Sequence, residues 1–254
     1  MNYNTNFNKN ILYLKNKPTA IFKIDNFLDQ NLYLSLKKNF PKIDESKLNL
    51  NTNNGQYLID ISKFNYDNKE QEEVFSNFEK IVYGEEFFNF LKSKFFFKIA
   101  TQQNSFKRML RYLRPAKLDT AKNSSFLDMF SSKVKMGYKC SYMCNKSSLF
   151  PHVDAQRKFL SLMLYMPDED GKDINYGTTF WDFKSSNFTN KHIGEKDLLE
   201  QFRAEGKVLY KTPFEPNCLY GFIRNDFSWH SVEPLDIHER YIRKSININI
   251  FYLN

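Results

Sequence analysis

The apolar pattern of this chain changes its period near residue 131, and this change constrains the fold more than any other feature. Beyond it, apolar residues alternate with polar ones or form short blocks bounded by turn residues such as Pro167-Asp168, as expected of β-strands. Because no crossover helices separate most of these blocks, we expect antiparallel pairing in a sandwich or jelly roll. The predicted strands cover residues 134–144, 158–166, 176–183, 207–214, 217–223 and 245–253.

Residues 1–130 carry mainly helical patterns. Asp29 is a candidate N-cap for a helix that runs to about residue 39, and a short strand over 20–25 precedes it. Residues 43–68 show no clear period. Apolar residues recur with helical spacing in three further segments, 74–82, 87–95 and 106–113.

The chain is therefore predicted to be an α+β protein with a single domain over residues 1–254. A mainly helical N-terminal part, 1–130, would pack against a jelly-roll core, or double-stranded β-helix, over 131–254. A hydrophobic fraction of 41% in 254 residues is enough for one sizeable core. A polar segment over 187–205 with one helical stretch interrupts the strands, and we expect it to lie over one mouth of the barrel.

Composition limits the partners and the cell compartment. Only 8 of the 37 basic residues are Arg, which leaves 29 Lys, and the chain is also rich in Asn, Ile and Phe. This bias accounts for a net charge of +8 without a nucleic-acid partner, and no apolar stretch reaches the ~18–20 residues of a membrane span. The three cysteines lack a C-x-x-C spacing, so we expect free thiols in a cytoplasmic protein.

The tripeptide His152-Val153-Asp154 is the first candidate site. Residues i and i+2 of an extended segment point to the same side, so the His152 imidazole and the Asp154 carboxylate face one point. His230, which follows a later predicted strand, is the candidate third ligand. Two histidines and one carboxylate on one face of an octahedron are typical of non-haem Fe(II) oxygenases, and they leave three positions open.

Arg243 and Ser245 begin the last predicted strand. Alternation places them on one face with Asn247 and Asn249, and three isoleucines on the other. An arginine on a polar inner face suits a charged ligand, because its planar fork binds a carboxylate through two hydrogen bonds. Arg240 is a competing candidate, but only Arg243 shares strand parity with Ser245.

These motifs, in this order, resemble the 2-oxoglutarate and Fe(II)-dependent dioxygenase superfamily, and most of all its prolyl 4-hydroxylase-like branch. The resemblance covers about residues 132–254 through H-x-D, a distal His and R-x-S. The segment over 20–29 with its following helix also resembles the start of that branch. Residues 43–130 match nothing that we can assign.

The resemblance implies two groups of site residues. One group would bind Fe(II), and its members are His152, Asp154 and His230. The other would bind 2-oxoglutarate, and its members are Arg243, Ser245 and Tyr142. Tyr165 is a weaker candidate for the cosubstrate and is expected to belong to the core. Such an enzyme would use dioxygen to hydroxylate an unactivated carbon of a peptidyl residue, an amino acid or a small metabolite.

Two other functions stay open from the sequence. One is a jelly-roll module that has lost catalysis and keeps a metal for structure, although a structural metal site has no use for a carboxylate-binding Arg243. The other is an oxygenase that acts on an anionic substrate, such as a nucleotide-linked sugar, steered by a basic helix. The basic residues of that predicted helix and its end are Arg108, Arg111, Arg114 and Lys117.

Overall fold

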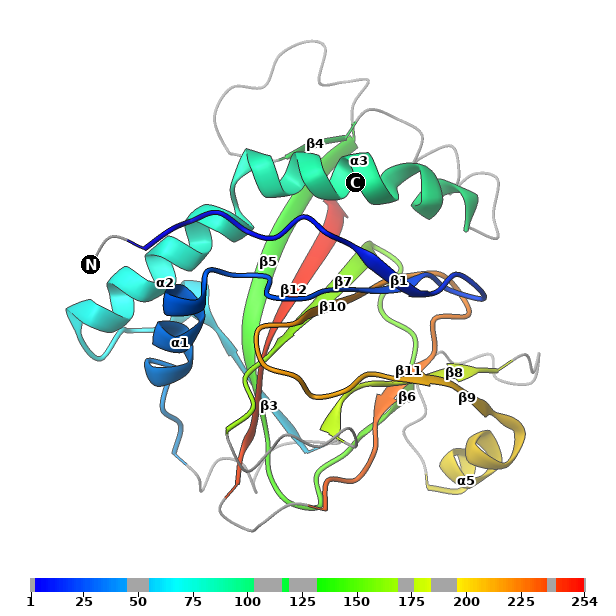
Figure 1. The fold of residues 1–254 in the computed structure, drawn as a ribbon. Helices are drawn as coiled ribbons and strands as arrows, with labels where there is room; N and C mark the ends of the chain where they lie inside the picture. Colours follow the sequence, from blue (N-terminus) through cyan, green and yellow to red (C-terminus); the bar gives the residue numbers. More distant parts are fainter. Residues whose placement is uncertain are drawn as a thin grey trace.

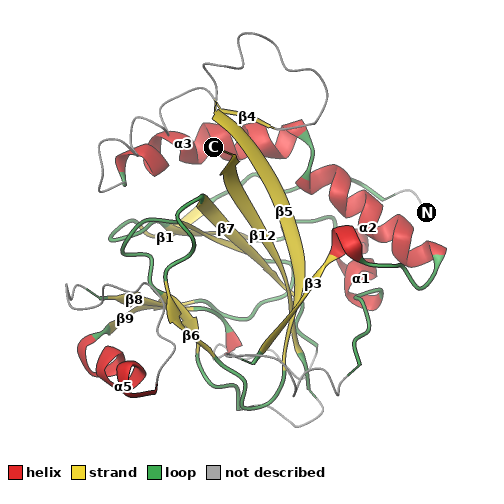
Figure 2. Ribbon diagram, turned by 180° about the vertical axis from the view of Figure 1, so that it is seen from behind, coloured by secondary structure: helices red, strands yellow, loops and turns green. Residues whose placement is uncertain are grey.

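Two β-sheets form the body of the chain, and three helices cover one face of the larger sheet (Figures 1 and 2). Apart from one parallel pair, the strands of the described residues pair in antiparallel fashion. The sequence prediction is thereby confirmed as far as a mixed α and β protein with mostly antiparallel sheets. The computed structural model describes residues 3–44, 55–102, 116–118, 132–168, 176–183, 196–236 and 241–253.

The larger sheet contains the long strands that the alternation predicts. In spatial order its strands are β1 (Leu12–Lys15), β2 (Ile21–Ile24), β10 (Leu219–Ile223), β7 (Lys158–Tyr165), β12 (Arg243–Leu253), β5 (Ser132–Met143) and β3 (Gln56–Asp60). A short strand, β4 (Ala116–Leu118), runs parallel to the start of β5. The central strand β12 pairs with β5 along its whole length and with β7 on its other side.

The smaller sheet brings distant parts of the sequence together. Its strands, in spatial order, are β6 (Leu149–His152), β11 (His230–Val232), β8 (Thr179–Asp182) and β9 (Lys207–Lys211). In the pairing of β6 with β11, His152 lies directly opposite His230. Two histidines separated by 78 positions in the chain therefore become neighbours through a single strand pair.

The alternation of β12 decides which side chains enter the space between the sheets. Ile246, Ile248 and Ile250 are fully buried in the main core, on the face that the helices cover. Arg243 and Ser245 lie on the opposite face, where they line a pocket between the two sheets. The predicted strand parity is therefore confirmed.

Three helices pack on the outer face of the larger sheet, in agreement with the helical spacing of their sequences. The first starts where Asp29 accepts hydrogen bonds from the backbone N–H groups of Asn31 and Leu32, as the N-cap prediction requires. Their buried faces join the strands in one core that is rich in Phe. The helices are α1 (Gln30–Lys38), α2 (Lys69–Val82) and α3 (Glu85–Thr101).

Three strands of the N-terminal half are missing from the sequence prediction, namely the short β4, which pairs with the start of β5, and the strands β1 and β3. β3 lies within the segment that shows no period, and β1 lies within the polar start of the chain. Both are edge strands of the larger sheet, and neither buries one face fully, so their sequences need not alternate. The N-terminal half thus adds strands to the sheet as well as helices to its outer face.

The segment predicted to cover one mouth of the barrel is only partly described. Its helix, α5 (Lys196–Glu205), packs Leu199 and Phe202 against the aromatic side chains of Trp181 and Trp229. These aromatic residues do not line the pocket between the sheets, so α5 covers the outer face of the smaller sheet instead. Residues 187–195 lie outside the described residues, as does the predicted helix over 106–113.

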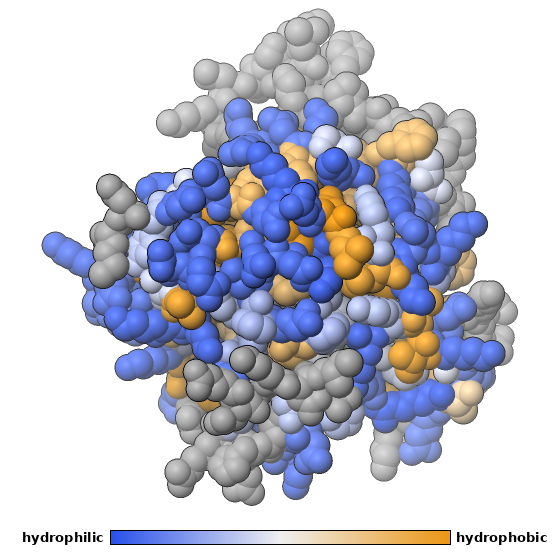
Figure 3. Space-filling view, viewed as in Figure 1, coloured by the Kyte–Doolittle hydropathy of each residue, from blue (hydrophilic) through white to orange (hydrophobic). Residues whose placement is uncertain are grey.

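The face of the molecule in Figure 3 is mostly polar where the chain is described. On the face shown in Figure 3, apolar side chains form small separate areas among hydrophilic ones. None of the helices that the structure describes combines the length and the apolar character needed to cross a bilayer.

Candidate active site

A pocket of about 230 Å³ lies between the two sheets. The larger sheet contributes the polar face of β12 and parts of β5 and β7, and the smaller sheet contributes β6 and β11. Its polar lining residues include His152, Asp154, His230, Arg243 and Ser245. The structure therefore brings all but one of the predicted site residues into one space.

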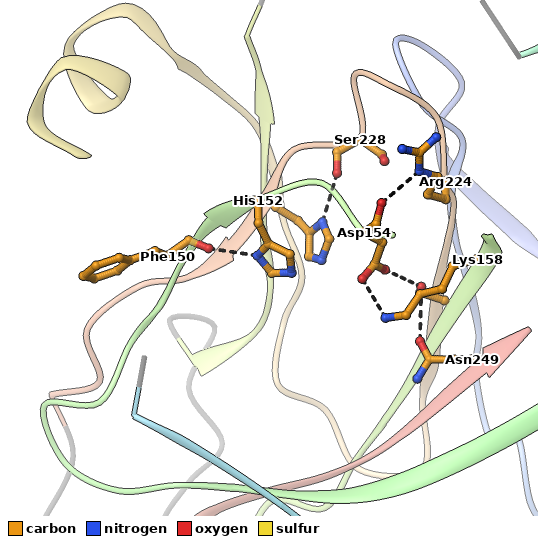
Figure 4. Close-up of polar contacts among 9 residues, drawn as sticks. Phe150, His152, Asp154, Lys158, Arg224, Ser228 and Asn249 are labelled. Atoms are coloured by element: carbon orange, nitrogen blue, oxygen red, sulfur yellow. Dashed lines mark hydrogen bonds and ion pairs between the residues drawn. The ribbon is translucent and has the colours of Figure 1, made fainter. Parts of the chain in front are cut away.

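His152, Asp154 and His230 form a compact group in this pocket. One potential ligand atom from each of the three lies within 4.8 Å of the others. The two imidazole rings lie side by side, with their centroids 4.2 Å apart, and Asp154 lies beside them (Figure 4). This spacing is suited to a metal ion bound by all three side chains.

Backbone carbonyl groups orient both imidazoles. The Nδ1 atom of His152 lies 2.9 Å from the carbonyl oxygen of Phe150, and that of His230 lies 2.9 Å from the carbonyl oxygen of Ser228 (Figure 4). Because a carbonyl oxygen only accepts, each Nδ1 must carry the hydrogen, and each Nε2 keeps its lone pair. Such a hydrogen bond is the usual support of a metal-binding histidine.

Asp154 is held as a buried carboxylate by two donors. Lys158 Nζ donates to Oδ1 at 2.6 Å, and Ser161 Oγ donates to Oδ2 at 2.6 Å. Burial by itself would raise the pKa of Asp154, but electrostatic interactions with His230, the Lys158 ammonium and His152 hold that pKa well below its usual value. Each carboxylate oxygen still has a lone pair for a metal ion.

The charge state of His230 and the fixed backbone of Asp154 both favour a cation bound to this cluster. Burial lowers the pKa of His230, while Asp154 opposes this effect, so the neutral imidazole that a metal requires is favoured. Arg224 fixes the backbone of Asp154, because its Nε donates to the Asp154 carbonyl oxygen at 3.0 Å. Two imidazole nitrogens and one carboxylate oxygen suit a first-row transition metal with open positions.

Arg243 is buried at the end of the same pocket where β12 begins. Its guanidinium lies over the rings of Tyr165 and Phe214, at 5.3 and 5.0 Å from their centroids, and Nε donates to the Tyr176 carbonyl oxygen at 2.5 Å. Burial lowers its pKa, and within the described part of the chain no carboxylate forms an ion pair with it. A buried cation of this kind is costly unless an anion joins it.

The arrangement of the sheets has counterparts among solved structures. A prolyl hydroxylase from Trichoplax adhaerens, solved with a peptide fragment of hypoxia-inducible factor, aligns with 91% of this chain and 83% of its own at a TM-score of 0.50 and 11% identity. The chain shares its fold with this prolyl hydroxylase. A prolyl-4-hydroxylase from Pseudomonas putida aligns with 93% of this chain and 95% of its own, at a TM-score of 0.48 and 11% identity.

No protein-family model and no curated protein sequence matches the chain. At 11% identity, the similarity to the Trichoplax prolyl hydroxylase establishes the fold and no more, because one fold supports many activities. The function must therefore be argued from the side chains in the pocket.

Tyr142 does not belong to this site, which corrects the sequence prediction. Its hydroxyl donates to the Pro41 carbonyl oxygen at 2.7 Å, and its ring packs on Phe40 and Tyr57 in the core beneath the helices. The reason is strand parity. In the pairing of β5 with β12, Ser141 lies opposite Ser245, so the next residue, Tyr142, points to the other face of the sheet.

Replacing Tyr142 with phenylalanine should therefore affect stability and not cosubstrate binding. The variant leaves the buried Pro41 carbonyl without its donor, which should reduce the free energy of unfolding by about 1–3 kcal/mol. Denaturant unfolding measures this loss, and calorimetry measures the affinity for 2-oxoglutarate. A large drop in that affinity with unchanged stability would return Tyr142 to the site.

Tyr165, in contrast, lies closer to the chemistry than a core residue would. Its ring lies beside the Arg243 guanidinium, while its hydroxyl is engaged with the hydroxyl groups of Thr178 and Thr212 at 3.0 and 2.8 Å. Tyr165 is fully buried and forms part of a small apolar cluster. It therefore supports Arg243 with its ring, and its hydroxyl is used within the protein.

Sequence reasoning missed three residues that support Asp154. Ser161 is the one polar residue in the apolar run 159–165 of β7, and this feature of the sequence indicates a polar contact on the inner face. Lys158 is the first residue of the same strand, and nothing in the sequence predicts its contact with Asp154. Arg224 is 1% exposed, which depends on tertiary packing that the sequence does not reveal.

Arg240, the competing arginine of the sequence analysis, lies outside the described residues. The three cysteines are free thiols, as predicted. A second group that could hold a metal, Asp25 with Glu215 and Cys218, already has the Lys23 ammonium between its two carboxylates.

Proposed function

We propose that this protein is a 2-oxoglutarate and Fe(II)-dependent dioxygenase that hydroxylates an unactivated carbon. The observation that carries the proposal is the joint presence, in one pocket, of two kinds of group. One is the His152, Asp154 and His230 cluster, and the other is a buried Arg243 that has no carboxylate partner among the described residues. A structural metal site explains the first group only, and an anion site explains the second group only.

The three clustered side chains would hold the iron. Two Nε2 atoms and one carboxylate oxygen would be its protein ligands, and such a ligand set leaves coordination positions for cosubstrate and dioxygen. With 2-oxoglutarate and dioxygen, bound Fe(II) supplies an oxidant strong enough to hydroxylate a C–H bond. The protein side chains keep the ligands in place, because carbonyl groups fix both histidines while Lys158 and Ser161 fix Asp154.

Arg243 and Ser245 would bind the C5 carboxylate of 2-oxoglutarate. The guanidinium is already ordered by Tyr165, Phe214 and the Tyr176 carbonyl group, so little conformational entropy is lost when an anion binds. The Ser245 hydroxyl lies on the same strand face and donates to Asn247 at 3.2 Å, a weak bond that it can exchange for a carboxylate.

The domain organisation follows from this function. We infer a single oxygenase domain over 1–254, in which residues 131–254 form the double-stranded β-helix that carries the site. The helices and added strands of 1–130 support its larger sheet. The substrate would be a peptidyl residue, an amino acid or a small metabolite, and the peptide bound by the Trichoplax prolyl hydroxylase favours the first of these.

An anaerobic titration tests the proposal and its main alternative. Fe(II) is added to the metal-free protein, then 2-oxoglutarate, and calorimetry records both binding steps. The expected result is one Fe(II) per chain and 2-oxoglutarate binding that depends on the metal, followed by succinate release when air is admitted. Fe(II) binding without 2-oxoglutarate binding would instead support an inactive metal-binding module.

A further inference from the structure

A second, larger cavity adjoins the metal pocket. This groove has a volume of about 550 Å³ and shares Lys139, Asn249 and Phe251 with the pocket. Arg243 and Phe251 lie eight residues apart on β12, which corresponds to about 26 Å along a strand. Asn249 lies near the ligand cluster, since Ser161 Oγ is in contact with both Asp154 and Asn249. The groove therefore begins on the far side of the metal ligands from Arg243.

A glycine keeps the floor of this groove open. Gly137 lies opposite Asn249 in the pairing of β5 with β12, and a Cβ atom added there would have nothing within 4 Å. Lys135 and Lys139 stand two positions to either side of Gly137, so they share its face of the strand. At this position the absent side chain leaves space between the metal pocket and the groove.

The walls of the groove are cationic. Lys135, Lys139 and Arg157 line it and are exposed, whereas Asp60 is the single carboxylate-bearing residue among its described lining. The described lining of the groove therefore carries a net positive charge.

The groove also borders a stretch of β5 that no described strand covers. β3 pairs with β5 from Lys139 to Met143, and β4 pairs with it from Ser132 to Val134. No described strand covers the same edge of β5 over residues 135–138, where Tyr83 flanks the groove. An elongated molecule can therefore extend from the metal pocket along the side chains of this stretch of β5.

We propose that this groove, lined by Lys135, Gly137, Lys139 and Arg157, binds an acidic polypeptide segment next to the residue that is oxidised. The inference rests on the proposed function, since the reacting residue must reach the metal cluster. A free amino acid bound at the metal cluster would leave most of the groove unused. A nucleic acid is less suited, because Asp60 lies in the groove and Glu79 accepts from Tyr138 behind it.

Peptide pools test the charge preference directly. The Fe(II) and 2-oxoglutarate complex is prepared without oxygen and mixed with fluorescent peptides of about twelve residues whose central residue varies. The flanking positions are rich in Asp and Glu, in Ser and Gln, or in Lys and Arg, and fluorescence anisotropy reports binding. The acidic pool should bind at least about tenfold more tightly than the neutral pool.

Variants then locate the binding surface. Lys135→Glu with Lys139→Glu should remove the preference for the acidic pool, whereas Lys207→Glu, on the exposed β9, should leave it unchanged. Gly137→Leu should block acidic-peptide binding, and Gly137→Ala should retain it, because a Cβ atom alone meets no neighbour. Thermal melting confirms that each variant is folded.

Two results would overturn the inference. One is equal binding of all three pools, and the other is a labelled oligonucleotide that binds more tightly than the acidic pool through the same lysines. These results differ from a failure of the proposed function. If the proposed function is wrong, the calorimetric titration shows no binding of 2-oxoglutarate. In that case the peptide pools can still be tested on the protein without cosubstrate. If the acidic pool binds and Gly137→Leu abolishes this binding, the groove is supported as a peptide site.

Discussion

Replacing Asp154 with alanine should abolish Fe(II) binding and substrate turnover. The carboxylate is the single anionic ligand in the cluster, and it lies among positive neighbours that include the Lys158 ammonium at 2.6 Å. Without it, a divalent cation would meet two neutral imidazoles and an unpaired ammonium in a mostly buried pocket, and repulsion by the ammonium would dominate. Calorimetry with Fe(II) measures the binding, and succinate release measures the turnover.

The control must separate metal binding from folding. In Asp154→Ala the Lys158 ammonium loses its partner, and this loss alone can destabilise the protein. The double variant Asp154→Ala with Lys158→Met removes both charges and should regain stability without regaining Fe(II) binding. Turnover at the normal rate in either variant would contradict the assignment of Asp154 as a ligand.

The parts of the site that sequence reasoning found are those fixed by local geometry. The spacing of His152 and Asp154 depends only on an extended backbone, and the parity of Arg243 and Ser245 depends only on an uninterrupted strand. The N-cap at Asp29 is likewise a contact within one turn of helix. Each of these expectations needed no knowledge of which strand pairs with which.

The errors came from strand pairing and from residues whose role depends on burial. Tyr142 would face the pocket if its strand were shifted by one residue, but register is set by the partner strands and not by the strand's own sequence. The edge strand β3 pairs with β5 while neither of its faces is fully buried, so it shows no period. Arg224 acts because it is buried beside Asp154, which only the folded chain determines.

Replacing Arg243 with alanine should weaken 2-oxoglutarate binding severely and leave Fe(II) binding largely intact. Arg243 is 3% exposed, so the cosubstrate carboxylate would be desolvated when it binds there. Breaking such a buried ion pair costs about 3–5 kcal/mol, which corresponds to a loss of about two to four orders of magnitude in affinity. The sequence predicts that Arg240, which does not share strand parity with Ser245, is exposed, so Arg240→Ala should change the affinity by less than about 1 kcal/mol.

Two further substitutions at Arg243 distinguish charge from shape. Arg243→Lys keeps the charge but lacks the planar fork, so it should bind 2-oxoglutarate more weakly than the parent protein and more tightly than Arg243→Ala. Arg243→Met fills the space between Tyr165 and Phe214 without a buried charge, so without cosubstrate it should unfold at no lower a temperature than the parent protein. If Arg240→Ala weakened 2-oxoglutarate binding more than Arg243→Ala, Arg240 would be the carboxylate ligand. The buried guanidinium of Arg243 would then need a different anion.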